Sequence, residues 1–351
     1  MDTKILKINL QNIKNFENEL KYAAEKIKDG ELVVIPTETV YGLGGDATNP
    51  EAAKKIYEAK GRPSDNPLII HISTPEDAER YTYTNEVYYK LADRFMPGPL
   101  TVVLPAKDSV PRETRGGLDT VAVRCPENII ARRVIEYSGV AIAAPSANLS
   151  GSPSPTSAKH VIDDMMGRVS VIIDGGDCDF GLESTIVKIE DDGSLLLLRP
   201  GKITLEELSL VADVTVANAV TDSLREGEVA LSPGMKYRHY APKSPLILLD
   251  GSIDRCIKYI DSTNEKNIAV LAYLDDIKLV REKLSYAKVF EFGFKDDFSA
   301  QAHLLFSILR EADEYDFTTI YAPVPDTSGV GLALYNRMIR AAAHTIIKVD
   351  E

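Results

Sequence analysis

The pattern of apolar and polar positions divides the chain into two halves with different organisation. In the first half, short apolar runs typical of buried strands lie between amphipathic segments of helical period, often at hairpin-like spacing. This close spacing favours an α/β domain with a mixed sheet over a purely parallel one. We expect helices over residues 16–28, 50–60, 128–137 and 156–166. We expect strands over residues 31–36, 67–72, 100–105, 120–124, 140–144, 169–174, 184–189 and 194–198.

The second half alternates strands and helices regularly. Regular alternation of this kind predicts a smaller, doubly wound domain built on a parallel sheet. Its expected strands are 246–250, 268–273, 288–292, 319–323 and 346–349, and its expected helices are 252–261, 275–285, 298–313 and 332–344. The polar, non-periodic segment between the two halves is interpreted as a linker. The predicted domains are therefore 1–212 and 245–351, joined by 213–244.

Composition narrows the function classes. The 351 residues include 40 Lys and Arg against 53 Asp and Glu, and the net charge of −13 argues against strong direct binding of nucleic acid. Cys125, Cys178 and Cys256 form no CxxC pair, which fits a reducing compartment better than a disulfide framework. The apolar stretches are too short to span a membrane and no signal peptide is recognisable, so a cytoplasmic protein is expected.

Several common catalytic and nucleotide-binding motifs are missing from the sequence. It contains no GxxxxGK[ST] phosphate loop, no GxGxxG after a strand, no HExxH and no GxSxG. Gly329-Val-Gly331 is interpreted as the start of the last helix, and the five histidines are too scattered for a His-rich metal centre. The acidic residues between 174 and 183 favour a solvated loop over a metal cluster. Metal ligands therefore stay unassigned.

Two segments in the first 71 residues could carry chemistry. Residues 36–44 join a strand to a glycine-rich turn with two threonines and a glutamate, although a hairpin turn with capping threonines is an alternative. Lys60 ends a helix, where its charge also suits the helix dipole. Arg62, followed by Pro63, lies beyond that helix on a loop at the entrance of a strand. Two cations on such a loop suit an anion such as a triphosphate.

Further polar residues follow predicted strands. Arg124 ends an apolar strand, and a guanidinium buried there needs a carboxylate or a phosphate. The stretch 143–156 is rich in hydroxyls and small residues and leads into a helix, which suits backbone approach to a nucleotide, although a simple Ser/Pro loop is an alternative. His71 also ends an apolar strand, where a lone histidine is more often a core or edge residue than a catalyst.

Taken together, these motifs resemble a known family. Residues 36–44, 60–68, 97–101, 120–126, 144–154, 181–185 and 198–201 resemble, in the same order, the motifs of the YrdC-like domain of the L-threonylcarbamoyladenylate synthases. The linker and the second half resemble the long form of that enzyme, which has a Rossmann-like C-terminal domain. The resemblance covers essentially the whole chain.

The resemblance implies a reaction and its site. The family makes threonylcarbamoyl-AMP and pyrophosphate from L-threonine, bicarbonate or CO2, and ATP with Mg2+, and its product feeds the machinery that modifies adenosine 37 of tRNA. By motif, the L-threonine contacts would be Thr37, His71, Arg124 and Ser184. The ATP contacts would be Lys60, Arg62, Asn66, Thr120, Ala144, Ser146, Asn148, Ser154, Arg199 and Tyr237. Lys60 and Arg62 would be catalytic, because they would stabilise the charge that builds on the phosphates.

Two other classes were weighed against this enzyme. YrdC-like domains are also associated with binding of double-stranded RNA, and the acidic net charge speaks against that function. They also occur inside larger carbamoyltransferases of hydrogenase maturation, which carry zinc-finger regions. The lack of cysteine pairs in this chain argues against that class.

The composition of the linker predicts more than a passive connection. Residues 232–242 hold Tyr237, His239 and Tyr240 between two prolines, with two cations among them. Prolines stiffen a segment, aromatic side chains seek burial, and cations suit a polyphosphate. We therefore expect residues 213–244 to form a lid over the site of the first domain, with a strap that only joins the domains as the alternative.

Overall fold

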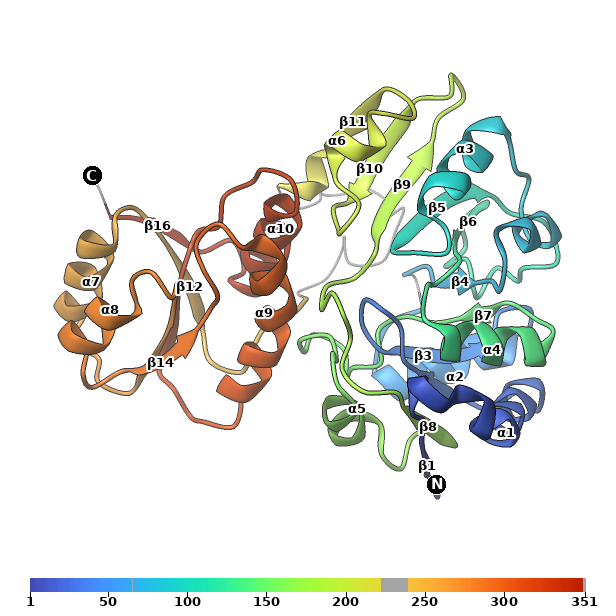
Figure 1. The fold of residues 1–351 in the computed structure, drawn as a ribbon, viewed down its shortest axis with the longest axis horizontal. Coiled ribbons are helices and arrows are strands. Elements are labelled where there is room, and N and C mark those ends of the chain that lie inside the picture. Colours follow the sequence, from blue (N-terminus) through green and yellow to red (C-terminus); the bar gives the residue numbers. More distant parts are fainter. Residues whose placement is uncertain (65, 222–238, 350–351) are drawn as a thin grey trace. The chain divides into compact units, whose positions relative to one another are not determined.

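The computed structural model describes residues 1–64, 66–221 and 239–349. It divides into two compact units, one formed by Met1–Ser150 with Ser154–Tyr237 and the other by Arg238–Glu351 with Gly151–Pro153. Figure 1 shows that each unit has a sheet of its own with helices beside it. The two units are described separately.

The first unit is built on an 11-stranded mixed sheet, which confirms the predicted sheet type. The strand order is β1-β8-β2-β3-β7-β4-β6-β5-β9-β10-β11. Parallel pairs such as β4/β6 and antiparallel pairs such as β5/β6 both occur. The strands are β1 (Lys4–Lys7), β2 (Val33–Ile35), β3 (Gly42–Asp46), β4 (Ile69–His71), β5 (Leu100–Pro105), β6 (Thr120–Arg124), β7 (Ile142–Ala143), β8 (Val171–Asp174), β9 (Thr185–Ile189), β10 (Leu195–Arg199) and β11 (Val214–Val216).

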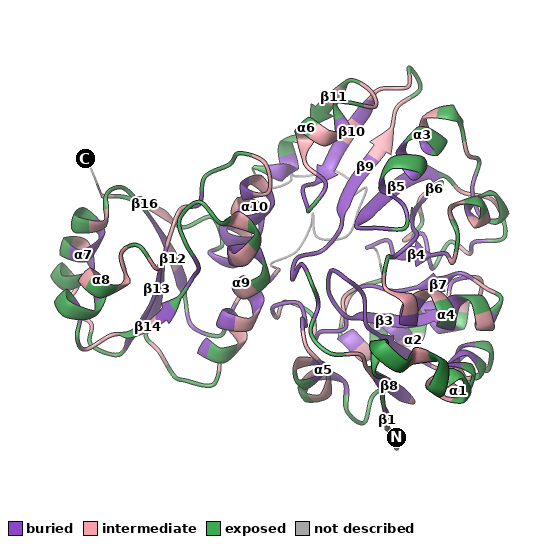
Figure 2. Cartoon of the chain, in the orientation of Figure 1, coloured by how far each residue is buried: buried purple, intermediate pink, exposed green. Residues whose placement is uncertain are grey.

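Local signals set the ends of the helices in this unit. Helix α2 begins at Pro50 behind the capping side chain of Asn49 and ends at Gly61, whose φ of 62° few other residues tolerate. The α-helices are α1 (Glu17–Lys28), α2 (Pro50–Lys60), α3 (Glu86–Phe95), α4 (Ile129–Ser138), α5 (Ala158–Met165) and α6 (Leu205–Leu208), and the 3-10 helices are η1 (Leu10–Phe16), η2 (Pro75–Arg80) and η3 (Asn218–Val220). Helices α1 and α4 pack on each other and on the strands below them, and their inner faces are buried (Figure 2).

The glycine-rich segment after residue 36 is part hairpin and part strand. Residues 42–46 form β3, which pairs antiparallel with β2, so the hairpin interpretation of this stretch is correct and its turn is residues 36–41. The glycines of β3 are needed for close packing and not for positive φ. A Cβ on Gly44 would lie 2.9 Å from the Val33 carbonyl oxygen and 2.9 Å from Ile142 Cγ2. The prediction that these glycines allow close approach of the backbone is therefore correct, but strand β3, whose packing requires that approach, was not predicted.

Strands β1 and β11 and helix α3 were also missed. The short strand β1 is exposed at three of its four positions and is paired with β8 in the described sheet, so its pattern carries little signal. Strand β11 pairs parallel with β10, and Ala219 and Val220 just beyond it are buried. The first unit thus continues past the predicted boundary at residue 212.

The second unit is a five-stranded, all-parallel sheet with the order β14-β13-β15-β12-β16, which confirms the doubly wound prediction. Figure 1 shows α7 and α8 on one face of the sheet and α9 and α10 on the other. A cavity of about 780 Å3 lies at the carboxyl ends of β12, β13 and β15. The elements are β12 (Leu246–Asp250), α7 (Ile253–Ser262), β13 (Ile268–Ala272), α8 (Ile277–Lys283), β14 (Lys288–Glu291), α9 (Phe298–Ala312), β15 (Thr319–Pro323), α10 (Gly331–Ala341) and β16 (Ile346–Lys348).

The carboxyl end of the predicted linker is fixed to the second unit. The ring of Tyr240 stacks on Phe306 at 5.2 Å, and the Lys243 amide donates to an Asp313 carboxylate oxygen at 2.6 Å. Residues 222–238, and with them Tyr237, lie outside the described residues. Across both units, no helix in the described part of the chain is long and apolar enough to cross a membrane.

Gly44→Ala should destabilise the first unit by about 2 kcal/mol, because the added Cβ would press on the backbone of β2, which cannot move without breaking the sheet. Gly45→Ala is the matched control, since its Cβ would meet only side-chain atoms at 3.2–3.4 Å. Urea unfolding of both variants measures the difference. Equal stability of the two would show that β2 and β3 are less closely packed than described.

Candidate active site

Two loops of the first unit run side by side and form the floor of the site. The loop 36–41 follows β2, and the loop 144–148 follows β7. The Leu43 amide donates to the Pro145 carbonyl at 2.8 Å, and the Ala147 amide donates to the Tyr41 carbonyl at 2.8 Å. The backbones therefore hold two predicted motifs, far apart in sequence, in one place.

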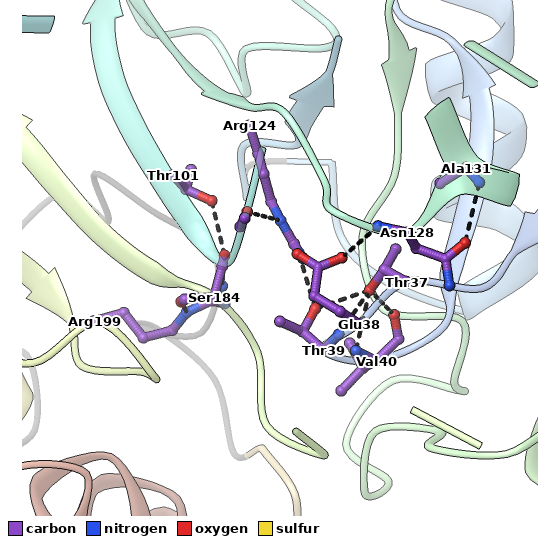
Figure 3. Close-up of polar contacts among 11 residues, drawn as sticks. Thr37, Glu38, Thr39, Val40, Thr101, Arg124, Asn128, Ala131, Ser184 and Arg199 are labelled. Carbon is purple, nitrogen blue, oxygen red and sulfur yellow. Dashed lines mark hydrogen bonds and ion pairs between the residues drawn. The ribbon is translucent and has the colours of Figure 1, made fainter. Parts of the chain in front are cut away.

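Arg124 lies in this site with a carboxylate partner supplied by the chain itself. Its guanidinium donates to Glu38 Oε1 at 2.5 Å, to Thr39 Oγ1 at 2.9 Å and to the Gly98 carbonyl at 3.3 Å (Figure 3). Both charged side chains are about 95% buried. Burial alone would raise the pKa of Glu38, but the adjacent Arg124 outweighs it and holds that pKa below its usual range.

His71 and Arg124 are direct neighbours across the parallel strands β4 and β6. Burial and, secondarily, the charge of Arg124 lower the pKa of His71 to about 3, so its ring is neutral at physiological pH. Its Nδ1 is buried without a hydrogen-bond partner among the described residues. A buried polar atom without a partner is rare, and at this position it is suited to a ligand.

Thr37 and Ser184 have well-defined hydroxyl positions near this pair. The Thr37 hydroxyl donates to the Val40 carbonyl at 2.6 Å and lies 2.9 Å from the Thr39 hydroxyl, which Arg124 also contacts. The Ser184 hydroxyl lies 2.7 Å from Thr101 Oγ1 (Figure 3). The structure thus gathers the four predicted L-threonine contacts around the carboxyl ends of β4 and β6 and the neighbouring start of β9.

Arg199 connects to the same region. Its Nε donates to the Ser184 carbonyl at 3.0 Å and its Nη2 to the Ser184 hydroxyl at 3.1 Å. Gly201 permits this packing, because a Cβ there would lie 2.4 Å from the Thr185 amide nitrogen. Arg199, predicted as an ATP contact, therefore also positions a predicted threonine contact.

Lys60, Ser146 and Asn148, three of the predicted ATP contacts, meet at the end of α2. The Lys60 ammonium donates to the Ser146 carbonyl at 2.5 Å and to the Asn148 carbonyl at 2.7 Å. The Ser146 hydroxyl donates to Asn148 Oδ1 at 2.6 Å. Arg62, the second residue predicted to be catalytic, lies two residues beyond α2 and is partly exposed. The lysine thus fixes the shape of the loop 144–148 from the end of α2.

The remaining predicted ATP contacts lie at several places in the unit. Asn66 is fully buried, and neither atom of its side-chain amide has a hydrogen-bond partner in the described chain. Thr120 begins β6, and the Ala144 amide donates to the Ile69 carbonyl at 2.9 Å. The Ser154 hydroxyl donates to Glu183 Oε1 at 2.5 Å.

Sequence reasoning missed the residues that hold the predicted ones. Glu38 and Thr39 were noted in their motif and given no role, and Thr101 and Gly98 were part of a motif only. Arg124 was predicted to need a carboxylate or a phosphate, and Glu38 is that carboxylate in the structure. In the described residues, no group of three or more His, Cys, Asp or Glu side chains is placed to hold a metal ion.

Comparison with known families agrees with this geometry. Residues 25–201 match a family model described as Telomere recombination, which covers the Sua5, YciO and YrdC proteins. Residues 203–343 match a model described as Threonylcarbamoyl-AMP synthase, C-terminal domain. Both units are thus recognised, in the order that the long form requires.

Whole-length relatives decide the family. The chain is 43% identical over 337 residues to the threonylcarbamoyl-AMP synthase of Pyrococcus abyssi, covering 95% of this chain and 96% of the relative. It is 42% identical to that of Bacillus subtilis, covering 94% of each chain. This chain belongs to the threonylcarbamoyl-AMP synthase family. A crystal structure of P. abyssi Sua5 complexed with L-threonine superposes with a TM-score of 0.87 at 41% identity, covering 98% of this chain and 99% of that one.

Membership of the threonylcarbamoyl-AMP synthase family makes the protein an enzyme of the nucleotidyltransferase type. The alternative of a non-catalytic RNA-binding module is not favoured, because the relatives that match along the whole chain are named as synthases. The predicted two-unit α/β fold is confirmed by the same relatives.

Glu38→Gln should lower the free energy of unfolding at pH 7 by about 2–3 kcal/mol, because it leaves the buried Arg124 charge without a counter-charge. Since the folded pKa of Glu38 is depressed, its contribution is complete above the ordinary carboxyl pKa of about 4.5 and is lost as the pH falls through the folded value. The stability of the variant should therefore change less than that of the wild type below pH 4.5.

Urea unfolding between pH 3 and pH 7 measures both effects. Glu51→Gln is the matched control, because Glu51 pairs with Lys54 on the surface, and its loss should leave stability nearly unchanged. Similar losses for Glu38→Gln and Glu51→Gln would contradict a special role of the buried pair.

Proposed function

We propose that the protein condenses L-threonine, bicarbonate or CO2, and ATP into threonylcarbamoyl-AMP and pyrophosphate. The observation that carries this proposal is a buried polar cluster with a fixed charge pattern, in which Arg124, a neutral His71 and two hydroxyls converge at the ends of β4 and β6. A relative with this fold has been crystallised with L-threonine. ATP is the expected second substrate of a synthase that forms an adenylate.

We assign the threonine end to Thr37, His71, Arg124 and Ser184. A guanidinium suits the carboxylate of the amino acid, and Arg124 can offer its remaining N–H groups beyond those held by Glu38 and Thr39. The unpartnered Nδ1 of His71 can bond the amine or the hydroxyl of threonine. Ser184, held by Thr101 and Arg199, supplies a hydroxyl of fixed position.

We assign the ATP end to the quartet Lys60, Arg62, Ser146 and Asn148, with further contacts from Asn66, Thr120, Ala144, Ser154, Arg199 and Tyr237. The clamp of Lys60 on the loop 144–148 brings a positive charge and several backbone groups to one place. The buried, unpartnered amide of Asn66 supplies a donor and an acceptor. Tyr237 enters this assignment by resemblance, since it lies outside the described residues.

In the proposed reaction, the protein has to position the substrates and stabilise the charge that develops on the phosphoryl oxygens. The threonine amine and CO2 form a carbamate with loss of a proton, and a carbamate oxygen attacks the α-phosphorus of ATP. The bond from that phosphorus to the bridging oxygen breaks, and its electron pair leaves with pyrophosphate. Lys60 and Arg62 are suited to stabilise the charge on the phosphoryl oxygens. No covalent enzyme intermediate is needed.

We propose that Mg2+ arrives with ATP. Mg2+ usually keeps several water ligands and is bound through substrate phosphates plus one or two carboxylates. Glu38 and Glu183, the buried carboxylates of the site, are engaged with Arg124 and Ser154. A magnesium ion held chiefly by the phosphates fits these residues, and it would supply further neutralisation of the leaving group.

We propose that the predicted lid, residues 213–244, closes over this site. Its beginning, β11 and η3, belongs to the first unit, and its end is anchored in the second unit through Tyr240 on Phe306 and through Lys243 on Asp313. Its aromatic and basic composition suits contact with a nucleotide polyphosphate. Closure would exclude water from the carbamate and the mixed anhydride while they form.

The product suits a partner that performs acyl transfer. A carbamate–phosphate mixed anhydride is an activated acyl group, so a transferase that passes the threonylcarbamoyl group to a tRNA adenosine would consume it. We propose that the protein works in the cytoplasm with that machinery. The acidic net charge of −13 agrees with delivery of a small molecule in place of strong direct tRNA binding.

Pyrophosphate release by the full-length protein should require ATP, L-threonine, bicarbonate and Mg2+ together and should not require tRNA. A coupled pyrophosphatase assay with each component left out in turn measures this requirement, and chromatography identifies the adenylate. L-Serine in place of L-threonine is the matched substrate control. Equal release of pyrophosphate without any amino acid would overturn the assignment.

Trypsin should cleave the full-length protein after Arg225, Lys236 or Arg238 more slowly in the presence of ATP and L-threonine than without them, because lid closure would cover the segment. Cleavage after Lys266, on the surface of the second unit, is the internal control and should keep its rate. Tyr237→Ala should weaken the protection. Unchanged cleavage with both ligands would make residues 213–244 a connector only.

A further inference from the structure

Arg115 is a buried cation with no partner among the residues that the structure describes. It lies on the loop between β5 and β6, is 8% exposed, and its Nε is buried without a hydrogen bond. Within the described chain its side chain forms no ion pair and no hydrogen bond. Burying an uncompensated charge is among the most unfavourable arrangements in a folded protein. Such an arrangement needs a reason.

The same loop holds a second arginine, Arg112, which is exposed and paired, as is usual for an arginine. Arg112 is exposed, donates to the Gly117 carbonyl at 3.1 Å and pairs with Asp119 at 3.3 Å. A carboxylate is therefore present on the loop, and the exposed arginine takes it while the buried one does not. Arg115 is left available for an anion from outside the chain.

A second side chain without a hydrogen-bond partner in the described chain, that of Asn66, lies on a segment next to the Arg115 loop. The loop packs directly on the segment that follows Asn66, because the Leu68 amide donates to the Thr114 carbonyl at 3.0 Å and a Cβ on Gly116 would lie 2.9 Å from the Pro67 nitrogen. The Tyr57 hydroxyl lies 2.9 Å from the Asn66 carbonyl and 3.2 Å from the Glu113 carbonyl. The side chains of Arg115 and Asn66, both buried with unsatisfied polar atoms, therefore project from backbone segments that pack against each other.

The position along the strands excludes the threonine carboxylate as the missing anion. Asn66 precedes β4, whereas His71 ends β4 beside Arg124. Arg115 likewise precedes β6, which runs parallel to β4 and ends at Arg124. Arg115 and Asn66 therefore lie toward the opposite end of the strands from Arg124. They lie instead near the end of α2. Tyr57, whose hydroxyl contacts the Asn66 and Glu113 carbonyls, belongs to the last turn of this helix, as does Lys60.

We propose that Arg115, together with Asn66, binds the two terminal phosphates of ATP and holds them as they leave. A guanidinium fork and an amide N–H match phosphate oxygens. When the bond between the α-phosphorus and the bridging oxygen breaks, the electron pair passes to pyrophosphate, and these donors contact the oxygens that gain charge. Asn66 was already among the predicted ATP contacts, and Arg115 was not. The inference rests on the proposed function for the identity of the anion.

The test compares pyrophosphate with AMP as ligands of the full-length protein. Isothermal titration with magnesium pyrophosphate should show about 10- to 100-fold weaker binding to Arg115→Ala than to the wild type, because a hydrogen-bonded charge contact is lost. AMP binding should change less than twofold. Arg115→Lys should restore part of the pyrophosphate affinity, and Arg112→Ala, the matched control on the same loop, should keep all of it.

A melting experiment separates binding from folding. Because the Arg115 side chain has no partner in the described part of the chain, Arg115→Met should melt no lower than the wild type without ligand, yet its melting temperature should rise much less on addition of magnesium pyrophosphate. Unchanged pyrophosphate affinity in Arg115→Ala and Arg115→Met, or an equal loss of AMP affinity, would overturn the proposal. Direct binding is measured without turnover, so a wild type that binds pyrophosphate and makes no adenylate would refute the proposed function alone.

Discussion

The buried ion pair between Arg124 and Glu38 is the contact on which the arrangement of the first unit's site depends. Two charges are removed from water at the end of β6, and that is tolerable because further donors and acceptors of the pair are satisfied by Thr39, Gly98 and the Asn128 amide. The pair fixes the loop 36–41 against β6. That loop in turn pairs with the loop 144–148, whose shape Lys60 sets from the end of α2. One electrostatic contact therefore determines where several predicted ligand contacts lie.

Some buried polar groups near the site have unsatisfied hydrogen-bonding atoms, which are suited to substrates. His71, Asn66 and Arg115 are buried in the first unit and keep polar atoms without partners in the described chain. Each costs free energy of folding that a nonpolar side chain of similar size would not. They occur around the two ends of the paired strands β4 and β6 and not throughout the core. A distribution of this kind is expected for a site that completes its hydrogen bonds with substrates.

Local signals allowed much of the fold to be predicted from the sequence. Helix α2 was predicted to within its observed ends, because Pro50 starts it and Gly61 stops it, and regular alternation predicted the parallel sheet of the second unit. Strand β3 was missed because a strand rich in glycine has no apolar alternation, and its reason is packing against residues that are distant in sequence. The pairing of Arg124 with Glu38 joins positions 86 residues apart, which no local pattern encodes. Likewise, nothing local separates Arg115 from Arg112.

The electrostatics of the threonine end bear on where protons go in the proposed reaction. Converting the threonine ammonium and bicarbonate into a carbamate releases one water and one proton. Around Arg124, the pKa of Glu38 lies below its usual range, that of His71 is about 3, and burial raises that of Cys125 to about 12. None of these three groups changes its charge near neutral pH, so none is suited to accept that proton and return it in each turnover. These three groups therefore leave the proton to another acceptor, such as water or bicarbonate. The protein's contribution is then a set of charges that stays constant while the substrates change theirs, which agrees with a site in which positioning carries most of the rate.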